Sequence, residues 1–253
     1  MNARTFTQPE TPQAFGAIEY PSSDGEPMAE TDLHRWLIIE ATMRLIHHYA
    51  ADPKVYVSGN LMVYYKEGKP KFCLSPDCFV AFGVGPGVRK TFKTWAEGVS
   101  PAVVFEFTSR STRHNDLVKK FAIYRDVWKV DEYFLFDPYE EYLNPPLQGF
   151  RRGDRGEFRP IPPDADGGVF SERLNLTVLR DGPLLAYRDA ETGKLVLNAY
   201  EDQARIATER SAEAEQVARD AEQRANNEAD ARRDAEAKLA EALAELARLR
   251  KSP

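Results

Sequence analysis

Residues 103–124, VVFEFTSRSTRHNDLVKKFAIY, decide the fold predicted for this protein. The first five residues read as a buried strand, because apolar side chains surround the single acid Glu106. From residue 115 onward apolar residues recur at helical spacing, and Asn115 or Asp116 can cap the first turn. A strand followed directly by a helix predicts an α/β unit. Burying a lone carboxylate is costly, so Glu106 needs a positive partner.

Two more apolar runs place this unit in a sheet. CFVAF at residues 78–82 precedes it, and EYFLFDP at residues 132–138 follows the helix. Strand, helix and strand in that order, with both strands nearly continuous in apolar residues, indicate a right-handed crossover in a sheet buried on both faces. Residues 139–198 alternate short β-like runs with Pro and Gly turns, which predicts an antiparallel extension at a sheet edge. The predicted fold class is α/β, with a mixed central sheet flanked by helices.

Two further elements are expected before this core. Residues 31–50 have the apolar spacing of an amphipathic helix, which Thr31 or Asp32 can cap. VYVSGNLMVYY, residues 55–65, consists of two β-rich runs around SGN. Two such runs separated by turn residues predict a β-hairpin.

Composition limits the classes of function. The chain has 253 residues, 42% of them hydrophobic, which permits one sizeable core with appendages. Its net charge is −6, so nucleic-acid binding would have to use local basic patches. Cys73 and Cys78 lack the spacing of a zinc site and are expected to be buried thiols. With neither an apolar signal core nor a run of the ~20 residues that span a bilayer, the sequence predicts a cytoplasmic protein without a membrane partner.

Three parts are expected along the chain. Residues 1–27, rich in Pro, Ser, Thr and Gly, predict a flexible N-terminal arm, and residues 28–198 hold the α/β domain. Residues 199–253 are dominated by Ala, Glu and Arg and predict a long helix, whose weak apolar seam is strongest after Leu239. This tail predicts a homodimer or higher oligomer formed through a coiled coil, and a solvated single helix is the alternative.

The acids around the decisive stretch point to metal chemistry. Asp77 stands at the entrance of the strand at residues 78–82, next to the strand that carries Glu106. Carboxylates on adjacent strands repel one another, and a hard cation such as Mg²⁺ or Mn²⁺ resolves the repulsion through oxygen ligands. Asp116, Lys120 and Tyr124 follow at four-residue steps and therefore share one helical stripe.

These motifs, in this order, resemble the PD-(D/E)XK nuclease superfamily and, more closely, the Uma-type family described as "putative restriction endonuclease". The matching pieces are Pro76–Asp77, Glu106–Ser109–Ser111–Thr112, Asp116–Lys120–Tyr124 and Glu132–Tyr133–Asp137–Pro138, with Gly25, Glu26 and His34 near the start. The resemblance covers about residues 20–200. It implies a restriction-endonuclease-like fold and a metal-dependent DNA endonuclease.

The resemblance also implies roles for single residues. Asp77 and Glu106 would be the metal ligands, joined by the backbone carbonyl of Phe107. Lys120 would polarise the attacking water or stabilise the pentacoordinate phosphate. The chain departs from the superfamily at Thr108, where a lysine is expected. The catalytic amine would therefore have to come from Lys120 on the helix.

Other residues near these motifs are weaker candidates. Possible additional site residues are Glu40, Ser109, Thr112 and Asp116. Basic residues that could contact DNA are Arg110, Arg113 and Lys119, with Arg125 and Lys129 nearby and Arg89, Lys90 and Lys93 on the preceding loop. A structural interpretation stands beside the functional one, in which Glu106 pairs with Arg125 or Lys120 and Tyr124 packs in the core.

Two rival functions stay open at this point. A catalytically degenerate nuclease fold could bind nucleic acid or a protein without cutting, which Thr108 in place of a lysine favours. Alternatively, the coiled coil could be the main functional element, with the globular part as its cargo. A pair of carboxylates acting on glycosides would need an aromatic sugar platform, which cannot be placed in this sequence.

Overall fold

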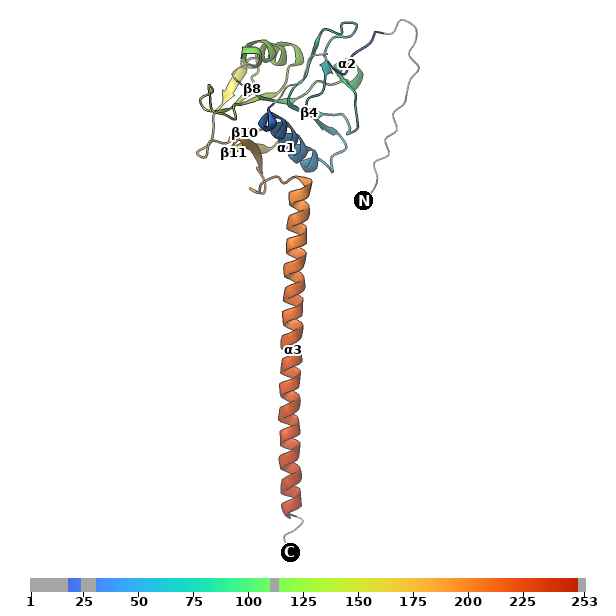
Figure 1. Ribbon diagram of the computed structural model, residues 1–253, viewed down its shortest axis with the longest axis vertical. Coiled ribbons are helices and arrows are strands. Elements are labelled where there is room, and N and C mark those ends of the chain that lie inside the picture. The colour runs from blue at the N-terminus through green and yellow to red at the C-terminus, as the bar shows by residue number, and fades with distance from the viewer. Residues whose placement is uncertain (1–17, 24–30, 110–113, 250–253) are drawn as a thin grey trace. The chain divides into compact units, whose positions relative to one another are not determined.

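The computed structural model describes residues 18–23, 31–109 and 114–249 (Figure 1). The chain divides into two compact units, Met1–Ala199 and Tyr200–Pro253. Within the described residues, every helix is too short or too polar to cross a membrane. The first unit contains the sheets and the candidate site, and the second is helical.

A mixed sheet forms the centre of the first unit, as the sequence predicts. Among the described residues it has six strands, in the order β1-β4-β6-β7-β8-β9. They are β1 (Val55–Ser58), β4 (Cys78–Phe82), β6 (Val103–Phe107), β7 (Glu132–Phe136), β8 (Leu147–Arg152) and β9 (Phe158–Ile161). β6 and β7 are parallel, in agreement with the predicted crossover, and the other neighbouring pairs are antiparallel. The α/β fold class is confirmed.

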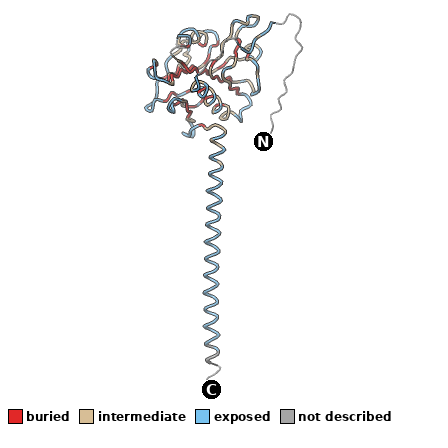
Figure 2. Tube along the Cα trace, viewed as in Figure 1, coloured by how far each residue is buried: buried red, intermediate tan, exposed pale blue. Residues whose placement is uncertain are grey.

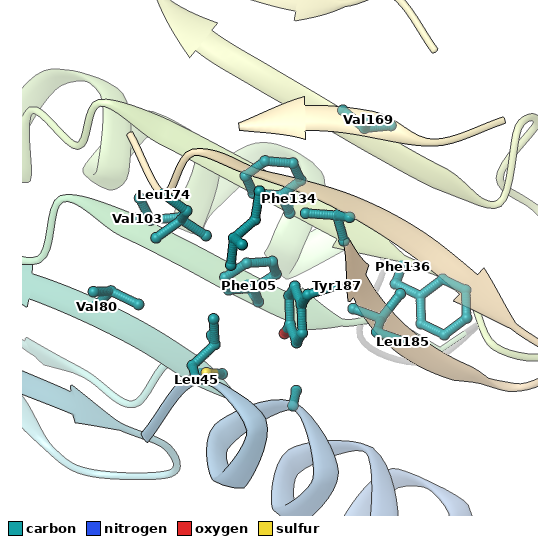
Figure 3. Close-up of a cluster of buried hydrophobic side chains, with 14 of the residues drawn as sticks. Leu45, Val80, Val103, Phe105, Phe134, Phe136, Val169, Leu174, Leu185 and Tyr187 are labelled. Carbon is teal, nitrogen blue, oxygen red and sulfur yellow. The ribbon is translucent and has the colours of Figure 1, made fainter. Parts of the chain in front are cut away.

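Helical segments cover both faces of this sheet, so the two faces of β6 have different surroundings. Phe105 and its alternate neighbours lie in one core cluster with α1 (Asp32–His48) (Figure 3). Val104 lies in a second cluster, with Tyr124 and Trp128 of the crossover. Successive side chains of a strand point to opposite faces. Glu106 therefore belongs to the face that the crossover covers.

The crossover is helical, but not the ordinary α-helix that its sequence suggests. It consists of two π-helical segments, η1 (Asn115–Lys120) and η2 (Ile123–Trp128). Along these wide π-helical turns residues four apart still share one side, since Nζ of Lys120 lies 3.1 Å from Oδ1 of Asp116. Such wide turns recur at functional sites.

The hairpin predicted at residues 55–65 is wrong. β1 pairs with β4, whereas β2 (Val63–Tyr64) lies in a small sheet between β3 (Cys73–Leu74) and β5 (Phe92–Lys93), which precedes α2 (Thr94–Glu97). At Gly59 the chain presses against the start of β4, where an added Cβ would lie 2.5 Å from the carbonyl oxygen of Asp77. The amide of Asn60 then donates to the carbonyl of Pro76 at 2.9 Å. These contacts turn the chain across β4 and away from β1.

The predicted edge extension is correct for β8 and β9 and wrong for the residues after them. β10 (Val169–Ser171), β11 (Leu176–Asp181) and β12 (Leu184–Asp189) form a separate antiparallel sheet. Its apolar side chains, including Leu185 and Tyr187, join the α1 side of the core (Figure 3). The buried Glu132 ties the two sheets together, since it accepts from the amide of Glu172 at 3.0 Å and from the Ser171 hydroxyl.

Part of the predicted N-terminal arm is described, at residues 18–23. There Tyr20 packs against Tyr64 and Trp95, with ring centroids 5.1 and 5.3 Å away. Residues 1–17 and 24–30, including Gly25 and Glu26 of the motif, lie outside the described residues. Of the two cysteines, Cys78 is buried and Cys73 is half-buried, and both are thiols.

The second unit is the long C-terminal helix that the sequence predicts. α3 (Ala199–Leu249) has 51 residues. Its described side chains from residue 207 onward are exposed (Figure 2). Ion pairs at i,i+4 spacing link Arg205 to Glu209 and Arg232 to Glu236. Pairs of this kind support an exposed helix only modestly.

Candidate active site

Glu106 finds its positive partner on the crossover. Its side chain is only 1% exposed, and its Oε2 accepts a hydrogen bond from the ammonium of Lys120 at 2.8 Å. The hydroxyl of Tyr124, four residues further on, donates to Oε1 at 2.5 Å. Both carboxylate oxygens are therefore held by one helical stripe. Arg125, the other cation considered for Glu106, pairs with Asp126 instead.

Asp116 brings a second buried acid to the same ammonium. Its Oδ1 lies 3.1 Å from Nζ of Lys120, at ion-pair distance, but has no hydrogen-bond partner among the described residues. Its backbone carbonyl accepts from the hydroxyl of Tyr133 at 3.1 Å, which anchors the first turn of the crossover to β7. Lys120 thus bridges two carboxylates that the sheet and the helix supply.

Asp77 joins the start of β4 to the end of β6 and to α1. Its Oδ2 accepts from the amide of Phe107 at 2.6 Å. Its Oδ1 lies 3.3 Å from Nε2 of His34, whose ring packs edge-on against Phe107. The side chains of His34 and Asp77 are 22% and 14% exposed. This side of the site is therefore partly open to solvent, in contrast to Glu106.

The cluster has more acids than bases, and the pKa values reflect this. Burial raises the pKa of Glu106 to about 8, opposed by Lys120 and reinforced by Asp77 and Asp116. Burial alone would lower the pKa of Lys120, but the three carboxylates outweigh it and raise the pKa above the ordinary value for lysine. Lys120 therefore stays protonated at neutral pH. The repulsion among the acids is relieved instead by the raised pKa of Glu106.

Thr108, which stands where the resemblance leads us to expect a lysine, is held at the end of the inner strand β6. It is buried, its amide donates to the carbonyl of Phe136 at 2.8 Å, and its hydroxyl accepts from that of Tyr142. Asp137 fixes the segment that follows β7 and carries Tyr142, because its carboxylate accepts from the amides of Tyr142 and Leu143. The ammonium that reaches Glu106 comes from the crossover.

The remaining candidates divide into three groups. Glu40 lies elsewhere, since it pairs with Arg44 at 3.6 Å and accepts from Asn198 at 3.2 Å. Lys119 is exposed on the crossover, and Ser109 is half-buried directly after β6. The candidates that lie outside the described residues are Arg110, Ser111, Thr112 and Arg113.

Of the basic loop before β5, Arg89 is engaged within the fold. It pairs with Glu97 at 2.7 Å, and its guanidinium lies 4.0 Å from the centroid of the Tyr56 ring. Arg89 is therefore a structural residue, and the neighbouring Lys90 is exposed.

Two members of the cluster were undervalued from the sequence. Tyr124 is fully buried, as core packing requires, but its hydroxyl also binds Glu106. The sequence left a structural role open for His34, and in the fold its Nε2 lies 3.3 Å from Oδ1 of Asp77. The four-residue spacing from Lys120 to Tyr124 could have indicated that Tyr124 belongs to the cluster. No spacing in the sequence indicates the contact of His34, because it joins residues far apart in the chain.

The oxygen donors of the cluster suit a hard divalent cation. Asp77, Glu106 and the carbonyl of Phe107 offer oxygen donors of the kind that Mg²⁺ or Mn²⁺ prefers. Asp77, Glu106 and Asp116 all act on the single ammonium of Lys120, so the acids of the cluster outnumber the cation that they share. Among the described residues no three His, Cys, Asp or Glu side chains surround one point. Mg²⁺ does not need such a cage, since it is commonly held by one or two carboxylates with waters and substrate phosphates.

Comparison with known proteins matches most of this chain to one protein family. The Uma2 family, described as "Putative restriction endonuclease", matches residues 10–178. Among solved structures, the chain is similar to a putative nuclease belonging to DUF820 from Anabaena variabilis. That similarity has a TM-score of 0.40 and 14% sequence identity, and it covers 54% of this chain and 71% of the other. No curated protein matches the sequence.

Proposed function

Since this chain belongs to the Uma2 family of putative restriction endonucleases, we propose that it is a metal-dependent DNA endonuclease. The active site would be the cluster of Asp77, Glu106 and Lys120. One observation carries the proposal, namely the ammonium of Lys120 at 2.8 Å from the buried Glu106. It supplies the amine that Thr108 does not, next to carboxylates that suit a divalent cation.

In this proposal Asp77, Glu106 and the carbonyl of Phe107 hold Mg²⁺ or Mn²⁺. The bound ion supplies charge neutralisation and water activation for phosphodiester hydrolysis. The amide of Phe107 and the ring of His34 orient Asp77, and Tyr124 fixes one oxygen of Glu106. Lys120 keeps its proton and stabilises negative charge that develops on the phosphoryl group. The exposed Lys119 would contact the DNA backbone, together with Arg110 and Arg113.

Cleavage of supercoiled plasmid DNA tests the proposal. We expect nicking by the wild type in Mg²⁺ or Mn²⁺, none in chelator, and a loss of about 100-fold or more in Asp77→Asn, because one ligand is removed. Asp154→Asn, at an exposed turn, is the matched control and should cut like the wild type. Intact plasmid under every metal condition would reject the endonuclease. If DNA is then still bound, and equally well by Asp77→Asn, the chain is a binding module.

Metal affinity should depend on pH in a defined direction. Because the pKa of Glu106 is raised from 4.5 to about 8, the free site holds a proton that the metal must displace. We expect Mg²⁺ to bind more tightly as pH rises, by up to about tenfold per unit, until pH passes about 8. Calorimetry in two buffers of different ionisation enthalpy measures the released proton. An affinity that stays constant or falls as pH rises would show that Glu106 does not bind the metal.

We also propose that α3 pairs with another copy of the chain. Leu239, Leu243 and Leu246 recur at four- and three-residue steps and are between 56% and 62% exposed, an apolar stripe that a partner helix could cover. Changing all three to Gln should convert an oligomer into a monomer in light scattering. The triple change Lys238→Gln, Glu236→Gln and Glu241→Gln is the control on the same stretch. Equal masses of the wild type and the leucine variant would favour a solvated single helix.

A further inference from the structure

A turn rich in lysine connects β2 to β3. We call residues 65–72 the lysine turn, because Lys66, Lys69 and Lys71 are exposed on it. The amide of Lys69 donates to the carbonyl of Lys66, and that of Phe72 to the carbonyl of Lys69, at 3.2 and 2.9 Å. Gly68 has φ of 73°, a left-handed conformation that suits glycine. Two consecutive tight turns therefore fix the backbone.

The side chains of the lysine turn are also held in place. The amide of Gly68 donates to the hydroxyl of Tyr20 at 2.7 Å, which docks the turn on the segment at residues 18–23. The ammonium groups of Lys66 and Lys71 lie 4.9 and 5.7 Å from the centroid of the Phe72 ring. Charges that are ordered before binding lose less conformational entropy when a ligand arrives.

The charge of the lysine turn is available to a ligand. Among the described residues no carboxylate pairs with Lys66, Lys69 or Lys71, and the turn contains one acid, the exposed Glu67. The whole chain carries a net charge of −6, so this patch is opposite in sign to the protein. Within residues 65–72 no large apolar side chain is exposed, and with Ile18 beside Gly68 as an exposed neighbour the patch has little apolar surface to insert into a membrane. An extended polyanion fits it best.

The lysine turn lies within reach of the candidate active site. Lys71 precedes Asp77 by six residues, and β3 leads directly into the segment that carries this acid. Six residues span at most about 20 Å. A DNA duplex rises about 3.4 Å per base pair, so this distance corresponds to about six base pairs. One bound duplex could therefore touch both places.

We propose that the lysine turn is a second contact for the DNA backbone, binding phosphates within about six base pairs of the phosphate that is cut. The identity of the partner rests on the proposed function, and the turn itself is a site of electrostatic, sequence-independent binding. It would hold the duplex against the protein while the metal site acts on one phosphate.

Binding of a fluorescent duplex in chelator tests this contact without cleavage. We compare the triple change of Lys66, Lys69 and Lys71 to Gln with a matched change of Lys54, Lys194 and Lys238 to Gln, which alters net charge equally. The lysine-turn variant should bind about tenfold or more weakly at 0.1 M salt, and its slope of log K against log salt should fall by about 1 for each lost contact. The matched variant should differ from the wild type by less than twofold. Changing the same three lysines to Arg should preserve binding, and circular dichroism monitors the fold of every variant.

The outcomes separate this inference from the endonuclease. If the wild type binds DNA through the lysine turn but never cuts, the contact stands and the proposed activity fails. If it cuts and both Gln triples bind alike, the contact is wrong and the activity stands. A wild type that does not bind the duplex at all would overturn the contact. The contact would also be wrong if the lysine-turn variant bound DNA as tightly as the wild type but bound phosphatidylserine vesicles more weakly. That result would mean that the lysine turn binds a membrane surface.

Discussion

Replacing Lys120 with methionine is expected to destabilise the protein and to stop DNA cleavage. The ammonium is the only cation that contacts Glu106 and Asp116 among the described residues, and both acids are buried. Methionine fills similar space but leaves these carboxylates without a counter-charge. Removing one partner of a buried ion pair costs about 3–5 kcal/mol of stability. Cleavage should fall by about 100-fold to 1,000-fold, because a preorganised positive donor is lost.

Urea unfolding at several pH values measures the stability change. In the wild type the pKa of Glu106 lies near 8, above the unfolded value of 4.5, so the folded state binds more protons between these limits. Stability linked to Glu106 is therefore highest at low pH and declines as pH rises towards 8. Without Lys120 the pKa should rise further, so the deficit of the variant should grow with pH. A deficit that shrinks as pH rises would contradict the buried pair.

The neighbouring lysine provides the control for stability. Lys119 precedes Lys120 on the same crossover, but its side chain is exposed. Lys119→Met should change the free energy of unfolding by no more than about 0.5 kcal/mol. Equal effects of the two substitutions would mean that burial of the Lys120 charge does not matter.

Replacing Glu106 with glutamine should stop cleavage without destabilising the protein. Cleavage should fall by about 1,000-fold or more, because a proposed metal ligand becomes neutral. Above about pH 8, where Glu106 is ionised, stability should stay the same or rise by about 1 kcal/mol, since a buried charge is removed and Lys120 keeps Asp116 as its partner. The amide can still bond to the hydroxyl of Tyr124. Titration with Mg²⁺ and urea unfolding measure the two effects separately.

Glu132 offers the matched control for this substitution. It is also a buried glutamate, on the strand next to Glu106, but its partner is Arg151 at 2.8 Å and it ties the two sheets together. Glu132→Gln should cost about 1–3 kcal/mol of stability and leave cleavage unchanged at temperatures where the protein is folded. If Glu132→Gln stops cleavage as completely as Glu106→Gln, both effects come from the fold and Glu106 has no special chemical role.

Much of the core could be predicted from local patterns. The apolar runs of β6 and β7 with a helix between them indicated a parallel crossover, and the structure confirms it. A strand buried on both faces needs nearly continuous apolar residues, so Glu106 stood out as the one residue that required a partner. The spacing of Lys120 from Asp116 placed both on one stripe. These inferences depend on chain neighbours, which a sequence displays directly.

Tertiary structure alone decided the strand partners and the completion of the site. β1 and β2 have the composition of a hairpin, but strand propensity does not specify which strand supplies the hydrogen bonds, and packing at Gly59 sends them into different sheets. His34 reaches Asp77 because α1 covers the face of the sheet where β4 begins. The sequence by itself determined which residues had to be buried and that Glu106 needed a cation. Which groups surround that buried charge depended on contacts between distant segments, because burial and strand pairing are properties of the whole packed domain.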